Sequence, residues 1–325
     1  MAGLTLTTSV HAASEQKTPP PSFTLQPGDS FSKQSIALAQ FKQYPGWEES
    51  LAANGRLILK SLKSPCILIV LEDVPTLSLW VLKQRGEIPE GIVIYDFDGA
   101  FFQSLPGLGA ASTYGTQEQL FRSREALERQ LLLNSKEPVY STARRDTHDL
   151  NGTRLVPSGL VYRFLKPGES EPDYVGIINQ LYPAPADSDQ PEFSSLLAVY
   201  HYMRGITAQC IPTYPGRRLA RTELIASAQT GGYLRGIHTM LAERFLELGD
   251  LDNALKSAQT GVDKKPEYFK SHSVLGDVLF ARQEWAAAMK AYQKSLQIYP
   301  DNSAIQKKLA VCKIRMNKLT PKVSF

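Results

Sequence analysis

Residues 237–300 read IHTMLAERFLELGDLDNALKSAQTGVDKKPEYFKSHSVLGDVLFARQEWAAAMKAYQKSLQIYP, and this stretch decides the fold of the C-terminal part of the chain. Three kinds of residue recur in it at a spacing of 34 positions. The recurring pairs are Leu241 and Leu275, Ala254 and Ala288, and Pro266 and Pro300. A fixed period of this length indicates structural units that repeat along the chain and stack on one another.

Each unit has the pattern of two helices. Leu241 and Phe245 lie four positions apart, which places both side chains on one face of a first helix. Ala254 is small because a second helix must cross the first closely, and Pro266 ends that second helix. This pattern resembles the tetratricopeptide repeat. The resemblance implies full repeats at about 235–268 and 269–302 and a third helix over 303–316. A helical bundle with a chance period is the alternative, and three agreeing kinds of position disfavour it.

In repeats that this stretch resembles, the first helices line an inner groove. The candidate binding residues are therefore Thr239, Glu243, Leu246, Ser273, Asp277 and Phe280. Two of them are acidic, so the groove does not resemble a clamp for a peptide's terminal carboxylate, which needs Lys and Asn. His238 and His272 also lie 34 positions apart, and we expect them on the first-helix surface without a metal. The repeats predict a protein or peptide partner, unless they serve only as a packing platform.

Length and composition limit the remaining possibilities. The chain has 325 residues, of which 42% are hydrophobic and 21% charged, which is typical of a soluble globular protein with two domains. A spread net charge of +4 predicts no nucleic-acid partner, and the longest apolar run, residues 65–71, is too short to cross a bilayer. The three cysteines lie far apart without metal-ligand spacing, so we predict no metal and no cofactor.

Strand and helix patterns alternate in the N-terminal part. We predict helices over 45–63, 75–84 and 116–134, and strands over 66–71, 91–97, 138–141 and 155–164. The alternation predicts a three-layer α/β domain with a short, mostly parallel sheet, followed by an all-α tetratricopeptide-repeat domain. The expected boundaries are a flexible arm over 1–30, the α/β domain over 31–170, a linker over 171–192, the helical domain over 193–316 and a tail over 317–325.

One strand pattern ends in the motif Asp96-Phe97-Asp98-Gly99. It resembles the first motif of haloacid-dehalogenase-type phosphatases, in which Asp96 would be the nucleophile and Asp98 the acid/base beside a magnesium ion. Ala100 stands where that motif has threonine, and no lysine followed by paired aspartates appears downstream. The alternative is an aspartate-rich turn at a strand end. The adjacent acids Glu72 and Asp73 are predicted to favour the start of the next helix rather than to hold a metal.

Four segments in the first half of the chain carry a second resemblance. They are LEDVPTLSLW at 71–80, GEIPE at 86–90, PVY at 138–140 and PSGLVYR at 157–163. Over about residues 45–312 the chain resembles the soluble C-terminal region of multi-spanning GT-C-type membrane glycosyltransferases related to protein O-mannosyltransferases. The family-motif residues are Asp73, Thr76, Trp80, Gly159, Tyr162 and Arg163. Pro75 stands where the family's turn carries a second acid, and the family's catalytic acids lie in its membrane portion, so no catalytic residue is transferred.

The predicted function is a non-catalytic protein-interaction scaffold. The glycosyltransferase resemblance implies a module beside a membrane glycosyltransferase on the extracytoplasmic side, and it makes Asp96 to Gly99 part of the scaffold. The small residues after Val10 are similar to a signal cleavage site, but no basic segment precedes them, so the residues themselves do not settle the compartment. The alternative from another class is a magnesium-dependent phosphohydrolase that uses Asp96 and Asp98. A third possibility is a fragment whose enzyme half is encoded upstream.

Overall fold

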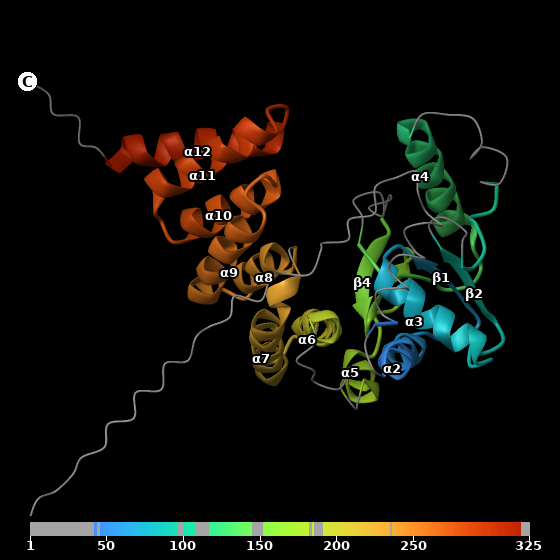
Figure 1. Ribbon diagram of the computed structural model, residues 1–325. Helices are drawn as coiled ribbons and strands as arrows, with labels where there is room; N and C mark the ends of the chain where they lie inside the picture. Colours follow the sequence, from blue (N-terminus) through green and yellow to red (C-terminus); the bar gives the residue numbers. More distant parts are fainter. Residues whose placement is uncertain are drawn as a thin grey trace, which may run out of the picture.

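A computed structural model of the chain describes residues 42–43, 46–96, 101–107, 117–144, 152–181, 184, 191–234 and 236–319. The predicted arm over 1–30 therefore lies outside the described residues, as does most of the predicted tail. The described residues form a small sheet with its helices, followed by a long stack of helices (Figure 1).

The N-terminal part alternates helices and strands as far as its third strand, and its last two strands follow without a helix between them. In chain order its elements are α2 (Trp47–Lys60), β1 (Cys66–Val70), α3 (Asp73–Gln84), β2 (Ile92–Asp96), α4 (Gln117–Asn134), β3 (Val139–Ser141), β4 (Arg154–Ser158), β5 (Val161–Leu165) and α5 (Tyr174–Gln180). Helix α5 lies within the stretch predicted as a linker. The Asp173 side chain caps it by accepting a hydrogen bond from the backbone N–H of Gly176 at 3.0 Å.

The sheet is mixed, with the strand order β2-β1-β3-β5-β4. Strand β1 is parallel to β2 and β3, whereas β5 is antiparallel to both β3 and β4. Two of the four pairings between the described strands are parallel and two are antiparallel, so the sheet is mixed and less parallel than predicted. The difference from the prediction arises at residues 155–164, which we expected to form one strand. They form a hairpin instead, because Gly159 has a φ of 70° and turns the chain between β4 and β5.

Successive residues of β1 point to opposite faces of the sheet and into different cores. Leu68 and Val70 lie in the cluster that contains Leu57 of α2, whereas Ile69 packs with Leu132 of α4. Helix α4 therefore covers one face of the sheet, and α2 and α3 lie on the other (Figure 1).

The hairpin at Gly159 is packed tightly against the end of α2. The backbone N–H of Leu160 donates to the Ser61 hydroxyl at 2.9 Å, and the Ser158 hydroxyl donates to the Ser61 carbonyl at 3.3 Å. A Cβ atom built on Gly159 would lie only 2.2 Å from Ser61 Oγ. The turn thus needs glycine both for its positive φ and for its contact with α2.

We expect Gly159→Ala to destabilise the protein more than Gly168→Ala. Both glycines have positive φ, so both substitutions introduce backbone strain of about 1 kcal/mol or more. Gly168 has nothing within 4 Å of an added Cβ, whereas Gly159 meets Ser61, which adds about 1–3 kcal/mol of overpacking. Urea denaturation of both variants measures the difference, and equal losses would contradict the packing argument.

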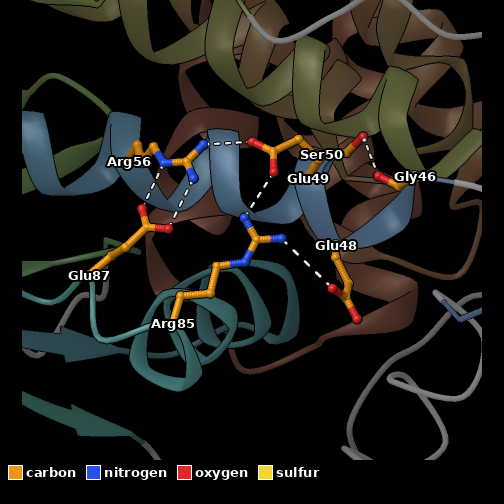
Figure 2. Close-up of polar contacts among 7 residues, drawn as sticks. All are labelled: Gly46, Glu48, Glu49, Ser50, Arg56, Arg85 and Glu87. Atoms are coloured by element: carbon orange, nitrogen blue, oxygen red, sulfur yellow. Dashed lines mark hydrogen bonds and ion pairs between the residues drawn. The ribbon is translucent and has the colours of Figure 1, made fainter.

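Two arginines join α2 to the end of α3 (Figure 2). Arg56 of α2 contacts Glu87 through Nε at 2.8 Å and through Nη2 at 3.1 Å, and it reaches Glu49 at 2.6 Å. Arg85 pairs with Glu49 at 2.8 Å and with Glu48 at 3.7 Å. The hydrogen bond from Arg85 and then that from Arg56 lower the pKa of Glu49, and the hydrogen bond from Arg56 lowers the pKa of Glu87. The pairs are exposed or only half-buried, so they orient the two helices more than they stabilise them.

The C-terminal part is a stack of helices. Its elements are α6 (Pro191–Gln209), α7 (Tyr214–Thr230), the short 3-10 helix η2 (Gly231–Tyr233), α8 (Ile237–Glu247), α9 (Leu251–Lys264), α10 (Phe269–Ala281), α11 (Trp285–Ile298) and α12 (Ser303–Leu319). The two predicted repeats correspond to the pairs α8/α9 and α10/α11, and the predicted third helix corresponds to α12. In Figure 1 the pairs follow one another away from the sheet, with α12 last.

The helix pair α6/α7 extends the stack one unit upstream of the predicted repeats. Ala220 of α7 is fully buried, as are Ala254 of α9 and Ala288 of α11 at the same 34-residue spacing. Ala208 of α6 likewise precedes Ala242 of α8 by 34 residues, and both are fully buried. These alanines are the signal that could have placed α6 and α7 in the same series.

One buried core connects the sheet to the helix stack. A single cluster of buried residues contains Leu68 of β1, Tyr200 of α6, Leu241 of α8 and Val278 of α10. A second cluster packs Leu196 of α6 against residues of α2 and α3. The two parts of the chain are therefore held together by apolar packing. None of the helices in the described residues has the length and apolarity needed to cross a membrane.

Candidate protein-binding surface

The six predicted groove residues lie on the first helices of the stack, α8 and α10, but they are not equally accessible. Thr239 is 2% exposed and its hydroxyl lies 2.9 Å from that of Ser271, and Ser273 is also buried. Leu246 and Phe280 are partly buried, and Phe280 makes an edge contact with the Trp285 ring at 4.8 Å. Thr239 and Ser273 therefore pack the helices together, and the residues of this set that remain in reach of a ligand are the other four.

The two acidic residues of the set are paired with lysines of the next first helix. Glu243 of α8 lies 3.2 Å from Lys270 of α10, and Asp277 of α10 lies 2.8 Å from Lys308 of α12. Asp277 also accepts a hydrogen bond from the Tyr292 hydroxyl at 2.7 Å. The face along α8, α10 and α12 therefore carries alternating charges that are mutually compensated, rather than the acidic groove that Glu243 and Asp277 alone suggest.

Sequence reasoning missed both lysines. Lys270 and Lys308 are 38 positions apart, so the 34-residue period does not relate one to the other. Each belongs to this face only because consecutive first helices lie side by side, which is a property of the stack and not of the period.

The two histidines are buried, so the prediction that they lie on the first-helix surface is wrong. His238 is 6% exposed and His272 is 7% exposed. His272 Nε2 lies 2.8 Å from the Pro266 carbonyl oxygen, which fixes the ring at the junction between repeats. The position that recurs near the start of each first helix faces the interior because the second helix crosses there.

Stability should fall in mild acid partly because of His238. Burial, and then the nearby Lys264 ammonium, lower the pKa of His238 below the value of about 6.5 that an unfolded histidine has. Below that pH the unfolded chain binds the extra proton, so the free energy of unfolding decreases as pH falls. We expect His238→Gln to show a smaller drop in melting temperature between about pH 7.5 and about pH 5 than the parent chain. An unchanged drop would exclude His238 as a cause.

Asp96, the last residue of β2, is hydrogen-bonded to the backbone at residues 101–102. Its side chain is 1% exposed, and Oδ2 accepts from the backbone N–H groups of Phe101 at 2.7 Å and Phe102 at 3.2 Å. Its Oδ1 atom has no hydrogen-bond partner among the described residues. Asp98 lies outside the described residues. No cluster of three or more His, Cys, Asp or Glu side chains that could hold a metal occurs within the described ranges. The phosphohydrolase alternative also needs Asp98, and it stays a prediction.

Most of the family-motif residues make contacts within the N-terminal part of the fold. Asp73 is the first residue of α3, and Thr76 donates from its hydroxyl to the Glu72 carbonyl at 2.6 Å. Trp80 makes an edge contact with Phe101 at 5.5 Å, and Arg163 pairs with Glu169 at 3.2 Å. Gly159 forms the tight turn described above. Burial raises the pKa of the Tyr162 hydroxyl well above its usual value. These contacts lie within the fold, and the role assigned to the motif residues stays a prediction.

Two comparisons with known proteins address the helix stack. Residues 239–303 match the tetratricopeptide repeat family. A segment of 76 residues is 32% identical to the "Small glutamine-rich tetratricopeptide repeat-containing protein 2" of Mycosarcoma maydis. That match covers 23% of this chain and 22% of the other protein, so the chain spans about a fifth of the relative's length. Neither comparison bears on the glycosyltransferase resemblance. The tetratricopeptide repeats predicted from the 34-residue period are therefore confirmed over residues 239–303.

Proposed function

We propose that this chain is a protein-binding scaffold module that holds a peptide segment of a partner along the face of α8, α10 and α12. The observation that carries the proposal is the tetratricopeptide-repeat match over residues 239–303, because stacked helical repeats create extended surfaces for protein segments. The paired charges and the partly buried Leu246 and Phe280 on this face suit a segment with both polar and apolar side chains.

A charge swap on this face tests the proposal. Peptides are first selected from a random peptide library on the full chain. Their affinity is then measured for the double variant Glu243→Lys with Lys270→Glu, which keeps the ion pair but reverses its direction. We expect a loss of about tenfold or more, because reversed charges oppose a ligand that fits the parent pattern. Exchanging the lysines Lys256 and Lys290 on the second helices for glutamines supplies the control.

Unchanged affinity in the swapped variant would mean that this face only packs the stack.

The finer proposal is that the partner is a membrane glycosyltransferase and that the module works on its extracytoplasmic side. It is supported by the four sequence segments quoted above. Co-purification of the full chain with a membrane glycosyltransferase from the same cells would test it, and a partner of any other class would overturn it.

A further inference from the structure

A basic hollow lies on another surface of the stack, at the turns between first and second helices. It has a volume of about 580 Å³, which is in the range of ligand-binding clefts. Its walls come from the start of α7, the turn between α8 and α9, and the end of α10. The lining residues are Tyr214, Arg217, Arg218, Arg221, Leu248, Gly249, Asp250, Leu251, Asp252 and Arg282.

Two of the four arginines are neutralised inside the hollow. Arg221 Nε lies 2.6 Å from Asp250 Oδ2, and Arg282 lies 2.7 Å from Asp252. Asp250 is also engaged as the cap of α9, since its Oδ1 atom accepts from the backbone N–H of Asn253 at 3.3 Å. These four side chains form the fixed frame of the hollow, and they contribute no net charge.

The other two arginines, Arg217 and Arg218, are exposed and have no ion-pair partner among the described residues. They occupy the fourth and fifth positions of α7, close to the positive end of its macrodipole. Basic side chains are unfavourable at that end, and no acidic residue occupies the first turn of α7. The helix dipole therefore does not favour them, and they add two uncompensated positive charges to the lining of the hollow.

An exposed aromatic ring stands beside these charges. Tyr214 is the first residue of α7 and is 79% exposed, although it lines the hollow. Tyrosine and arginine are the side chains most enriched at the energetic centres of protein interfaces. We propose that the hollow binds an acidic peptide segment of a partner protein, with its carboxylates on Arg217 and Arg218 and an apolar side chain against Tyr214.

The charges of the hollow favour a peptide over a nucleic acid. Arg282 already pairs with Asp252 and, at 2.8 Å, with the nearby Glu284, so this side of the hollow has one carboxylate in excess and disfavours a continuous phosphate backbone. A short segment with two or three carboxylates can meet the free arginines and avoid the fixed acids. This surface is distinct from the face of α8, α10 and α12, so either proposal can fail without the other.

Fluorescence anisotropy on the full chain tests the inference. The probe is a short fluorescein-labelled peptide of alternating leucine and glutamate. We expect Arg217→Glu with Arg218→Glu to weaken binding by more than about tenfold, because two charge-assisted contacts are lost. The control is Lys256→Glu with Lys290→Glu, which changes the net charge equally at two exposed lysines of α9 and α11, and we expect it to keep affinity within about twofold. Tyr214→Ala should weaken binding several-fold.

The stability of the arginine variant and the binding of the probe separate the possible outcomes. The arginine variant should melt no lower than the parent chain, because acidic residues suit the start of α7, so lost binding cannot be attributed to unfolding. No binding of the probe to the parent chain would overturn the inference, as would equal losses in the two double variants. Tighter binding of a single-stranded oligonucleotide, with the same dependence on Arg217 and Arg218, would replace the acidic peptide by a nucleic acid.

Discussion

Replacing Glu223 by leucine is expected to lower the free energy of unfolding by about 3–5 kcal/mol, because it breaks a buried charge pair. Glu223 of α7 lies 3.2 Å from Arg204 Nε and 2.7 Å from His201 Nδ1, both on α6. Arg204 is 1% exposed and its Nη1 donates to the Tyr200 hydroxyl at 2.8 Å. Removing the carboxylate leaves the guanidinium buried between the two helices without this counter-charge.

A double variant separates the charge effect from the loss of packing. Arg204→Met with Glu223→Leu removes both charges and keeps apolar volume, so we expect it to recover most of the loss. Urea denaturation of the parent chain, both single variants and the double variant gives the coupling energy. If the double variant is as unstable as the sum of the two single variants, the pair does not explain the effect.

Residues 191–325, produced without the sheet, are expected to lose cooperative unfolding or to melt far below the full chain. Leu196 of α6 packs in the cluster that contains Leu51 of α2 and Leu77 of α3, and the Tyr200 hydroxyl donates to the Leu181 carbonyl at 2.9 Å. Exposing a few large apolar side chains costs about 1.5–3 kcal/mol each, and their sum approaches the whole stability of a typical domain.

The matched control for this experiment keeps every contact and cuts only the chain. A protease site inserted between residues 181 and 191 is cleaved in the folded protein, and we expect the two pieces to stay together on size-exclusion chromatography. Near-ultraviolet circular dichroism and thermal melting then compare the cleaved pair with the fragment alone. Pieces that separate, or a fragment as stable as the full chain, would show that α6 does not join the two parts.

The helical part could be predicted from the sequence because the residues that determine its packing recur at a fixed spacing. Leu241, Ala254 and Pro266 recur at one spacing, and a repeat unit is determined by contacts within itself and with its neighbours. The same reasoning stopped short of α6 and α7, although Ala208 and Ala220 continue the period. Their hairpin has no proline at its end, since Gly232 stands 34 positions before Pro266.

The remaining features depend on contacts between distant segments. The run at 155–164 reads as one strand unless Gly159 is recognised as a turn, and the close approach of Ser61 to that turn comes from a distant segment. The charge pattern of the first-helix face depends on lysines from the following helix, which no local pattern reveals. The basic hollow joins Arg217 to Arg282, whose separation along the chain exceeds one repeat. Local propensity cannot predict such juxtapositions.

The shared core of the sheet and the first helices has a mechanical consequence. Among the described residues, one cluster of buried apolar side chains runs from β1 through α6 to α10. A partner seated on the repeats would therefore be held at a constant angle and distance from anything attached to the sheet. Under the scaffold role proposed above, such a shared core would limit the relative motion of the two parts of the chain.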